Sequence, residues 1–218
     1  MKDPLRQLYP DLSGRPEPAS DADLLTSIRR KVDDSIRAKQ ALVDQSGPAL
    51  LDTARALAGV FAGGGRLLTM GNGGSSCDAA HVAVEFMHPI TVGRKALPAM
   101  HLGADLPMLT AVGNDVGFDE IFVRQVIAHG RSGDALIGFS TSGNSTNLLR
   151  AFEVASQRGL VTLGFSGGDG GRMASAGFVQ HCVIVPSPSV HRVQEGHLVA
   201  YHVLWDLVHT LLASAEAP

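Results

Sequence analysis

Four side chains that could carry out acid–base chemistry or bind a metal occur in two short stretches far apart in the chain. His81 and Glu85 lie four residues apart within "GNGGSSCDAAHVAVEF", and Gln194 and His202 lie eight apart within "RVQEGHLVAYH". If both stretches are helical, His81 and Glu85 share one face, and Gln194 and His202 are about 80° apart around the axis. Imidazole, carboxylate and amide oxygen together make a plausible zinc ligand set. The alternative is that Glu85 is a solvated helix residue and His202 a polar break in an apolar stripe.

Two loops rich in glycine, serine and threonine could bind a phosphate group. "GNGGSS" begins at Gly71, and "FSTSGNSTNLL" runs from Phe139 to Leu149 with five hydroxyls in seven residues. Hydroxyls and backbone N–H groups at a helix N-terminus suit a phosphate monoester, and a helix cap needs only one serine. Neither loop has the spacing of a dinucleotide or nucleoside triphosphate motif. For the first loop alone, a tight turn capped by Ser75 or Ser76 explains the residues equally well.

The elements that must position these residues alternate between short apolar runs and helical patterns. The runs at 66–70, 135–139 and 161–165 each enter a glycine- or serine-rich loop and then a helix. Strand, loop and helix repeated in this way predict a parallel sheet with helices on both faces, in which ligands bind at the carboxyl ends of the strands. We expect further strands at 99–102 and 182–185, and a long helix from Val190 to about Ala213.

The N-terminal part has a different pattern. Residues 1–19 contain four prolines and no apolar period, which predicts an irregular arm. A helix should begin near Ser20 or Asp21 and end near Gly47, and Pro48 suits the first position of a second helix. We therefore expect a single domain over residues 20–218 that includes an N-terminal helical pair.

Composition narrows the class of protein. The chain has 218 residues, is 44% hydrophobic, and carries a formal net charge of −3. This charge provides no electrostatic footprint for nucleic acid or an anionic membrane, and two cysteines are too few for a disulfide framework. No apolar run approaches the roughly 18 residues of a membrane span. The sequence predicts a cytoplasmic protein with no nucleic-acid or membrane partner.

The motifs occur together in an order that resembles the sugar isomerase (SIS) domain, and more narrowly the phosphoheptose isomerases. The matching stretches are "GNGGSSCDAAH", "VGNDVGFDEIFVRQV", "STSGNS", "DGGRMA" and "RVQEGHLVAYH", within residues 45–212. The resemblance implies an α/β, three-layer αβα sandwich with a five-stranded parallel sheet. It also implies a homotetramer with sites between subunits, a phosphosugar substrate and no nucleotide or redox cofactor.

The resemblance implies roles for individual residues. Glu85 and His202 correspond to the acid–base pair, and one zinc ion per subunit would be bound by His81, Glu85, Gln194 and His202. The residues expected to hold the phosphate are Ser75, Ser140, Thr141, Ser142 and Ser145. Those expected at the sugar are Asn72, Gly73, Asn114, Asp115 and Gln194, although an Asn-Asp pair is also a common turn.

The reaction implied is the conversion of sedoheptulose 7-phosphate to D-glycero-D-manno-heptose 7-phosphate through an enediolate. A desolvated carboxylate is a suitable base for moving a proton between C1 and C2, and a histidine can exchange protons near neutral pH. Two positions depart from the family pattern: Pro89 replaces an arginine, and His191 replaces a common aspartate. Arg94, Lys95 or His191 are candidates to substitute in substrate recognition.

Two alternatives from other functional classes remain at this point. A similar SIS protein, the DnaA initiator-associating protein, uses its tetramer as a binding platform, and a sugar-phosphate sensor is a related possibility. The second alternative is a SIS enzyme of another reaction, such as a phosphosugar lyase or an aminosugar isomerase. The presence of both Glu85 and His202 favours an isomerase.

Overall fold

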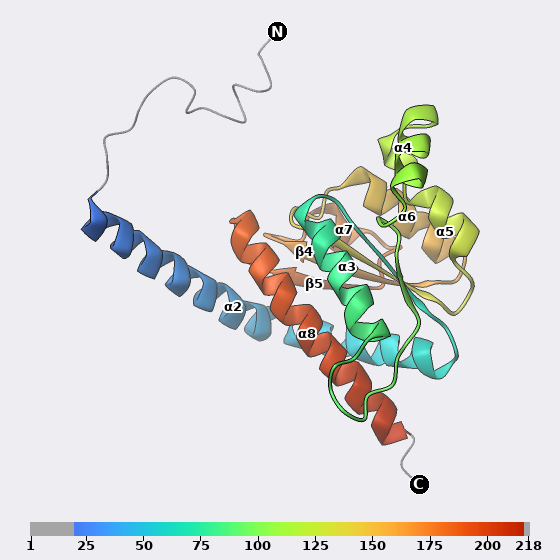
Figure 1. Ribbon diagram of the computed structural model, residues 1–218, viewed down its shortest axis with the longest axis horizontal. Helices are drawn as coiled ribbons and strands as arrows, with labels where there is room; N and C mark the ends of the chain where they lie inside the picture. Colours follow the sequence, from blue (N-terminus) through green and yellow to red (C-terminus); the bar gives the residue numbers. More distant parts are fainter. Residues whose placement is uncertain (1–19, 216–218) are drawn as a thin grey trace. The chain divides into compact units, whose positions relative to one another are not determined.

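The computed structural model describes residues 20–215, whose centre is a five-stranded parallel sheet with helices on both faces (Figure 1). In chain order the elements are α2 (Asp21–Ala62), β1 (Leu67–Gly71), α3 (Gly74–Met87), β2 (Ala99–His101), α4 (Leu106–Asp115), η2 (Phe118–Glu120), α5 (Val123–His129), β3 (Ala135–Ser140), α6 (Thr146–Gln157), β4 (Val161–Gly167), α7 (Gly171–Ser175), β5 (His181–Val185) and α8 (Val190–Ala215). The predicted three-layer α/β fold is confirmed. The predicted irregular arm, residues 1–19, lies outside the described residues.

The strands form where the sequence has short apolar runs because helices cover both faces of the sheet. Every residue of β1 and β3 is buried, as expected for central parallel strands. The strand order is β2-β1-β3-β4-β5, with Leu67 of β1 paired to Ala99 on one side and to Ala135 on the other. After β1, the chain therefore forms β2 on one side of this strand and then crosses over to form β3 on its other side.

Each face of the sheet has its own hydrophobic core. On one face, residues from α2, α3 and α8 pack on the sheet, with Leu57, Phe86 and Tyr201 among them. On the other face the core is formed by α4, α5, α6 and α7, with Phe152 of α6 fully buried. Figure 1 shows α3 and α8 side by side, an arrangement that brings together residues more than 100 positions apart in the sequence.

The prediction of two N-terminal helices is wrong, since α2 is one helix that continues through Pro48. A proline inside a helix removes one N–H donor but has a helical φ, so packing can retain it. The second half of α2 is anchored by its buried face, including Leu50, Leu57 and Phe61. Within the described part of the chain, residues 20–34 and residues 35–215 belong to two compact units. In the first, Ser20 caps the helix as predicted: the Asp23 N–H donates to Ser20 Oγ, at 3.3 Å.

Just before Pro48, Ser46 contacts the last strand of the sheet. Its hydroxyl donates to the carbonyl oxygen of Ile184 at 2.8 Å and accepts from the Ile184 N–H at 3.2 Å. A single side chain thus satisfies both backbone groups of one residue on β5, which ends the sheet formed by the described residues and pairs there with β4.

Among the described residues, α8 is the one helix long and apolar enough to cross a membrane by length and composition. The sequence prediction concerned an unbroken apolar run, and α8 does not contain one of that length, because Glu195, His202 and Asp206 interrupt it. The helix contributes Val193, Ala200 and Leu204 to the core on one face of the sheet. Its apolar residues are thus used at least partly in packing the domain.

Candidate active site

The two predicted phosphate loops meet at the point where the strand order reverses. β1 lies between β2 and β3, and the helices that follow β1 and β3 pack on opposite faces of the sheet. Such a reversal leaves a crevice at the carboxyl ends of the two strands, where open α/β proteins bind their ligands. The side-chain amides of Asn72 and Asn147 join the two loops through reciprocal hydrogen bonds of 2.9 Å.

The loop after β3 has hydroxyls that are not used to cap its helix. Ser145 occupies the N-cap position of α6 but makes no side-chain capping bond, and its Oγ lies 3.0 Å from Ser140 Oγ. Ser140 is buried, whereas Ser142 is exposed and Thr141 half-buried. The four residues of this loop that were predicted to bind phosphate therefore lie around the start of α6. Among them, the Ser145 hydroxyl does not cap the helix.

The loop after β1 does not use its serines as caps either. Gly73 is the N-cap of α3 and has a φ of 55°, a left-handed conformation that favours glycine. Ser75 and Ser76 lie within the first helical turn, and their N–H groups donate to the carbonyls of Asn72 and Gly73, both at 3.0 Å. The interpretation of Ser75 or Ser76 as an N-cap is therefore wrong.

At the other end of α3, the structure brings three of the predicted metal ligands together. The ligand atoms of His81, Glu85 and His202 all lie within 4.8 Å of one another. His81 Nε2 is 3.0 Å from Glu85 Oε1, and the rings of His81 and His202 meet edge to face with centroids 5.3 Å apart. The His81 side chain is 43% exposed and that of Glu85 23%. This cluster is suited to proton transfer or to metal binding, and it is open to solvent in the single chain.

Several neighbours of this cluster were not identified from the sequence. The Tyr201 hydroxyl lies 2.7 Å from His81 Nδ1, and the Trp205 N–H donates to the backbone oxygen of Glu85 at 2.9 Å. Burial, with the carboxylates of Asp78 and Glu85, raises the pKa of Tyr201, so this phenol stays protonated. Burial also raises the pKa of Asp78 to about 6, partly opposed by His81. Asp78 could have been identified from the sequence, because it lies three residues before His81 and residues i and i+3 share a helix face.

The remaining predicted residues lie at separate places. Gln194 packs its side-chain amide against Gly74, where a Cβ would clash with it, so it lies at the start of α3 about two turns before His81. Asn114 and Asp115 lie in the last turn of α4, both exposed, and Asn114 Nδ2 donates to Asp115 Oδ1 at 2.8 Å. Their interpretation as a turn is wrong, and their contact with a sugar stays a prediction.

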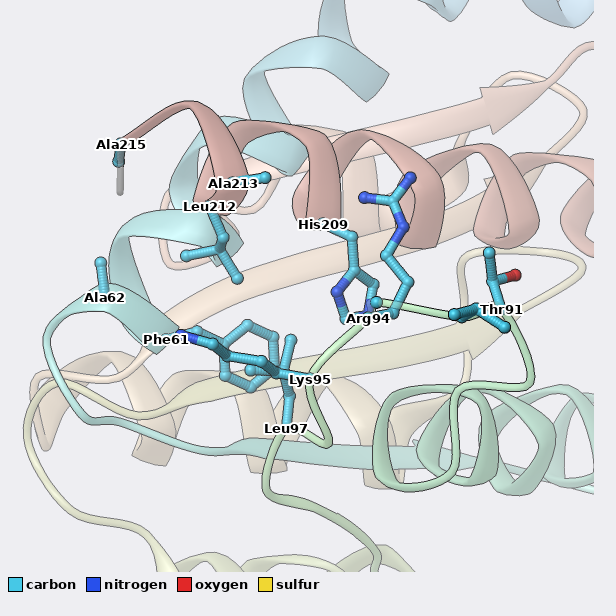
Figure 2. A pocket seen from close by; sticks show the side chains of 12 residues that line it. Phe61, Ala62, Thr91, Arg94, Lys95, Leu97, His209, Leu212, Ala213 and Ala215 are labelled. Atoms are coloured by element: carbon cyan, nitrogen blue, oxygen red, sulfur yellow. The ribbon is translucent and has the colours of Figure 1, made fainter. Parts of the chain in front are cut away.

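A cavity of about 700 Å³ lies between the end of α2, the loop 88–98 and the last turns of α8 (Figure 2). Its walls include Phe61, Leu97 and Leu212, together with Arg94 and Lys95, two candidates for substrate recognition; none of the predicted catalytic, metal or phosphate residues lines it. Arg94 at its rim donates to Asp206 at 2.9 Å and lies over the Trp205 ring, 5.7 Å from the centroid. Arg94, a candidate to replace the arginine missing at Pro89, is thus bound to α8.

Comparison with known proteins gives a consistent result. A family model described as the SIS domain matches residues 32–167. A phosphoheptose isomerase of Desulfovibrio desulfuricans is 44% identical over 185 residues, which cover 85% of this chain and 86% of that protein. Another, from Chlorobium phaeobacteroides, is 45% identical over 82% of this chain and 79% of its own length.

Solved structures agree with these sequence relatives. The phosphoheptose isomerase of Neisseria gonorrhoeae has a TM-score of 0.80 and 35% identity, covering 86% of this chain and 99% of its own. That of Francisella tularensis has a TM-score of 0.81 and 33% identity, covering 85% and 98%. From the strand order, the two loops and these similarities together, the chain belongs to the SIS-domain proteins and, among them, to the phosphoheptose isomerase family.

Proposed function

We propose that this protein isomerises sedoheptulose 7-phosphate to D-glycero-D-manno-heptose 7-phosphate. The observation that carries the proposal is that one helix, α3, joins both parts of the required site. Its first turn contains Ser75, beside the crevice between β1 and β3, and later turns carry His81 and Glu85 next to His202. The names of the relatives, phosphoheptose isomerases at about 40–45% identity, support the same reaction.

The phosphate group would bind at the crevice through neutral donors. Hydroxyls can each donate to a phosphate oxygen, and the N-termini of α3 and α6 add a favourable dipole. Proposed ligands are Ser75, Ser140, Thr141, Ser142 and Ser145. Asn72 and Gly73 would contact the adjoining part of the sugar, and Gln194, packed on Gly74, would lie between the two ends.

Glu85 would act as the base that removes a proton from one of the two reacting carbons and, after exchange with solvent, delivers a proton to the other. This transfer interconverts ketose and aldose through an enediolate. His202, whose ring lies 5.3 Å from that of His81, would exchange the proton between the two substrate oxygens. Both groups lie close enough for one substrate carbon pair to contact them, since their ligand atoms are within 4.8 Å.

The donor set of His81, Glu85 and His202 also fits zinc. Gln194 is the proposed fourth ligand, and its amide, which lies against Gly74 about two turns away, would have to turn toward the cluster to bind the ion. Two imidazoles and a carboxylate are common zinc ligands, and a ligating histidine usually bonds an outer partner through its second nitrogen. Tyr201 provides such a partner for His81 Nδ1 at 2.7 Å. When bound, zinc would polarise the substrate carbonyl and stabilise the enediolate.

We further propose that the protein acts as a cytoplasmic homotetramer with sites completed between subunits. Apolar side chains at helical spacing in the first part of α2 are exposed in the single chain: Leu25, Ile28 and Val32 each leave more than half of their surface uncovered. Exposed apolar side chains also flank the reaction end of the site, namely Val84, Leu198 and Val203. Neighbouring copies would cover both surfaces and shield Glu85 from water.

The test is turnover of sedoheptulose 7-phosphate by the purified protein in D2O, with and without added zinc, followed by chromatography and mass spectrometry. We expect an aldose 7-phosphate that is one mass unit heavier, because an enediolate takes its proton from solvent-exchanging groups. No product under either condition would overturn the proposed reaction. A product without deuterium would contradict proton exchange with solvent.

A further inference from the structure

A serine and a histidine without a predicted role meet beside the phosphate loops. His101 is the last residue of β2 and lies opposite Thr69 of β1 in the sheet register. Its Nε2 is 3.1 Å from the Oγ of Ser76, which directly follows Ser75 in the first turn of α3. The pair therefore lies on the β2 side of the same helix start whose Ser75 is a proposed phosphate ligand.

The surroundings of His101 determine which of its nitrogens carries hydrogen. Nδ1 is 3.3 Å from the Thr69 carbonyl oxygen, which can only accept, and 3.4 Å from the Thr69 hydroxyl. That hydroxyl already donates to the carbonyl of Ala79 at 2.7 Å. Nδ1 must therefore be the donor. Burial lowers the pKa of His101, so the ring is neutral near pH 7 and Nε2 has a free lone pair.

It follows that Ser76 donates its hydroxyl hydrogen to His101. A serine has one hydrogen to donate and two lone pairs, so Ser76 Oγ can then interact with a ligand only as an acceptor. A phosphate dianion also has only acceptors, and it gains nothing from such a group. A sugar hydroxyl, in contrast, can donate to it. The pair thus distinguishes the two chemical parts of a sugar phosphate.

Gly103 leaves the approach to this hydroxyl open. A Cβ at position 103 would lie 3.0 Å from Ser76 Oγ and would clash with the imidazole of His101. The backbone of Gly103 does not have a positive φ, so its conformation alone does not require glycine. Glycine at position 103 is instead explained by the Ser76–His101 pair, with which a side chain would clash, and by the space beside that pair, which a side chain would fill.

We propose that Ser76 binds a hydroxyl of the phosphorylated sugar as a hydrogen-bond acceptor, with His101 as the positioning residue that fixes its direction. Gly103 leaves room for that hydroxyl. This inference takes its ligand class, a phosphorylated polyhydroxy compound, from the proposed function. It does not depend on the proposed reaction.

The test compares two probes by calorimetry on the full chain: sedoheptulose 7-phosphate and inorganic phosphate. Ser76→Ala and His101→Leu should each weaken sugar phosphate binding about fivefold, the worth of one hydrogen bond, and leave phosphate binding unchanged. The double variant should be no weaker than either single one, because both remove the same interaction. Ser75→Ala is the matched control and should weaken both probes.

Two more variants separate this role from a structural one. His101→Gln places an amide oxygen where Ser76 can still donate, so it should restore binding lost in His101→Leu. Gly103→Ala should reproduce the loss of Ser76→Ala without changing either polar group. Unchanged sugar phosphate binding in Ser76→Ala, or an equal loss for both probes, would overturn the inference. If the binding pattern holds but sedoheptulose 7-phosphate is not turned over, the proposed reaction fails and this inference stands.

Discussion

The two ends of α3 differ in chemistry and in exposure. At the N-terminal end, the groups are neutral and already paired: Ser140 with Ser145, and Asn72 with Asn147. At the other end, His81, Glu85 and His202 are titratable and partly or largely open to solvent. One helix thus connects a region whose polar groups pair within one chain to a region that a single chain leaves uncovered.

This difference fits the roles proposed for the two ends. Neutral polar groups can be buried when they bond to one another, so the end proposed to bind phosphate can be organised before any ligand arrives. A base and an acid at the reaction end need protection from water only when the substrate is present. The exposed Val84 and Val203 beside the cluster are consistent with a second subunit that supplies this cover.

The largest effect is expected from Glu85→Gln. Loss of the base should lower kcat about 1,000-fold, within the usual range for general acid–base groups, and leave the binding of inorganic phosphate unchanged. Steady-state kinetics and calorimetry measure the two quantities. Glu153→Gln is the matched control, since this α6 side chain is 40% exposed, and the variant should keep full activity. A parallel loss of phosphate binding in Glu85→Gln would contradict the separation of the two ends.

The second prediction concerns the pH dependence of stability and the histidine His197 of α8. This residue packs against the sheet, unlike His202 of the same helix, which lies at the proposed reaction end. His197 is fully buried, with Nε2 3.0 Å from the Ser166 carbonyl, and burial lowers its pKa to about 4. The unfolded chain takes up this proton near pH 6.5, so stability should fall as pH drops from 6.5 to 4. The loss is on the order of 3 kcal/mol.

Urea unfolding at several pH values and one protein concentration measures this dependence. His197→Gln can still donate to Ser166 but does not titrate, so its stability should decline less between pH 6.5 and 4. Equal pH dependence in wild type and variant would show that His197 is not the group responsible.

A smaller effect is expected from Ser140→Ala combined with Ser145→Ala. Ser140 and Ser145 bond to each other, so one of their two hydroxyl hydrogens is left for the phosphate. Loss of one hydrogen bond to a charged phosphate costs about 1.5–3 kcal/mol, so KM should rise roughly 10- to 100-fold. The value of kcat should change little, because the reaction end is untouched. Ser214→Ala, whose hydroxyl bonds only within α8, is the control. A fall in kcat with constant KM would contradict the proposed division.

The smallest effect is expected from Tyr201→Phe, which removes the outer partner of His81. Such partners typically change metal affinity by 10- to 100-fold, and we expect the lower value because the ring remains. Competition with a chromophoric chelator measures zinc affinity directly, without reference to activity. Tyr9→Phe, on the other tyrosine of the chain, is the control. Unchanged affinity in Tyr201→Phe would argue against His81 as a zinc ligand.

The fold could be predicted because its strands are short apolar runs with glycine or serine immediately after them. β1, β3 and β4 were each expected within two residues of their observed ends. The pairing of His81 with Glu85 was also predictable, since it depends only on helical spacing. The prediction failed at Pro48, where packing of the following turns outweighs the lost donor, and local sequence does not report packing.

The missed residues depend on contacts between distant segments. Tyr201 and Trp205 lie 120 positions from their partners His81 and Glu85, so no spacing rule links them. The role of His101 depends on strand register, which places it beside Thr69 and next to Ser76. Only the three-dimensional structure shows that these side chains are in contact.

Ser46 has a consequence for how molecules of this protein associate. The outer edge of β5 could otherwise accept a strand from another molecule, as exposed sheet edges do in aggregation. The Ser46 hydroxyl occupies both backbone groups of Ile184, so a strand added there would have to displace it. Sheet extension into filaments is thereby opposed at this edge.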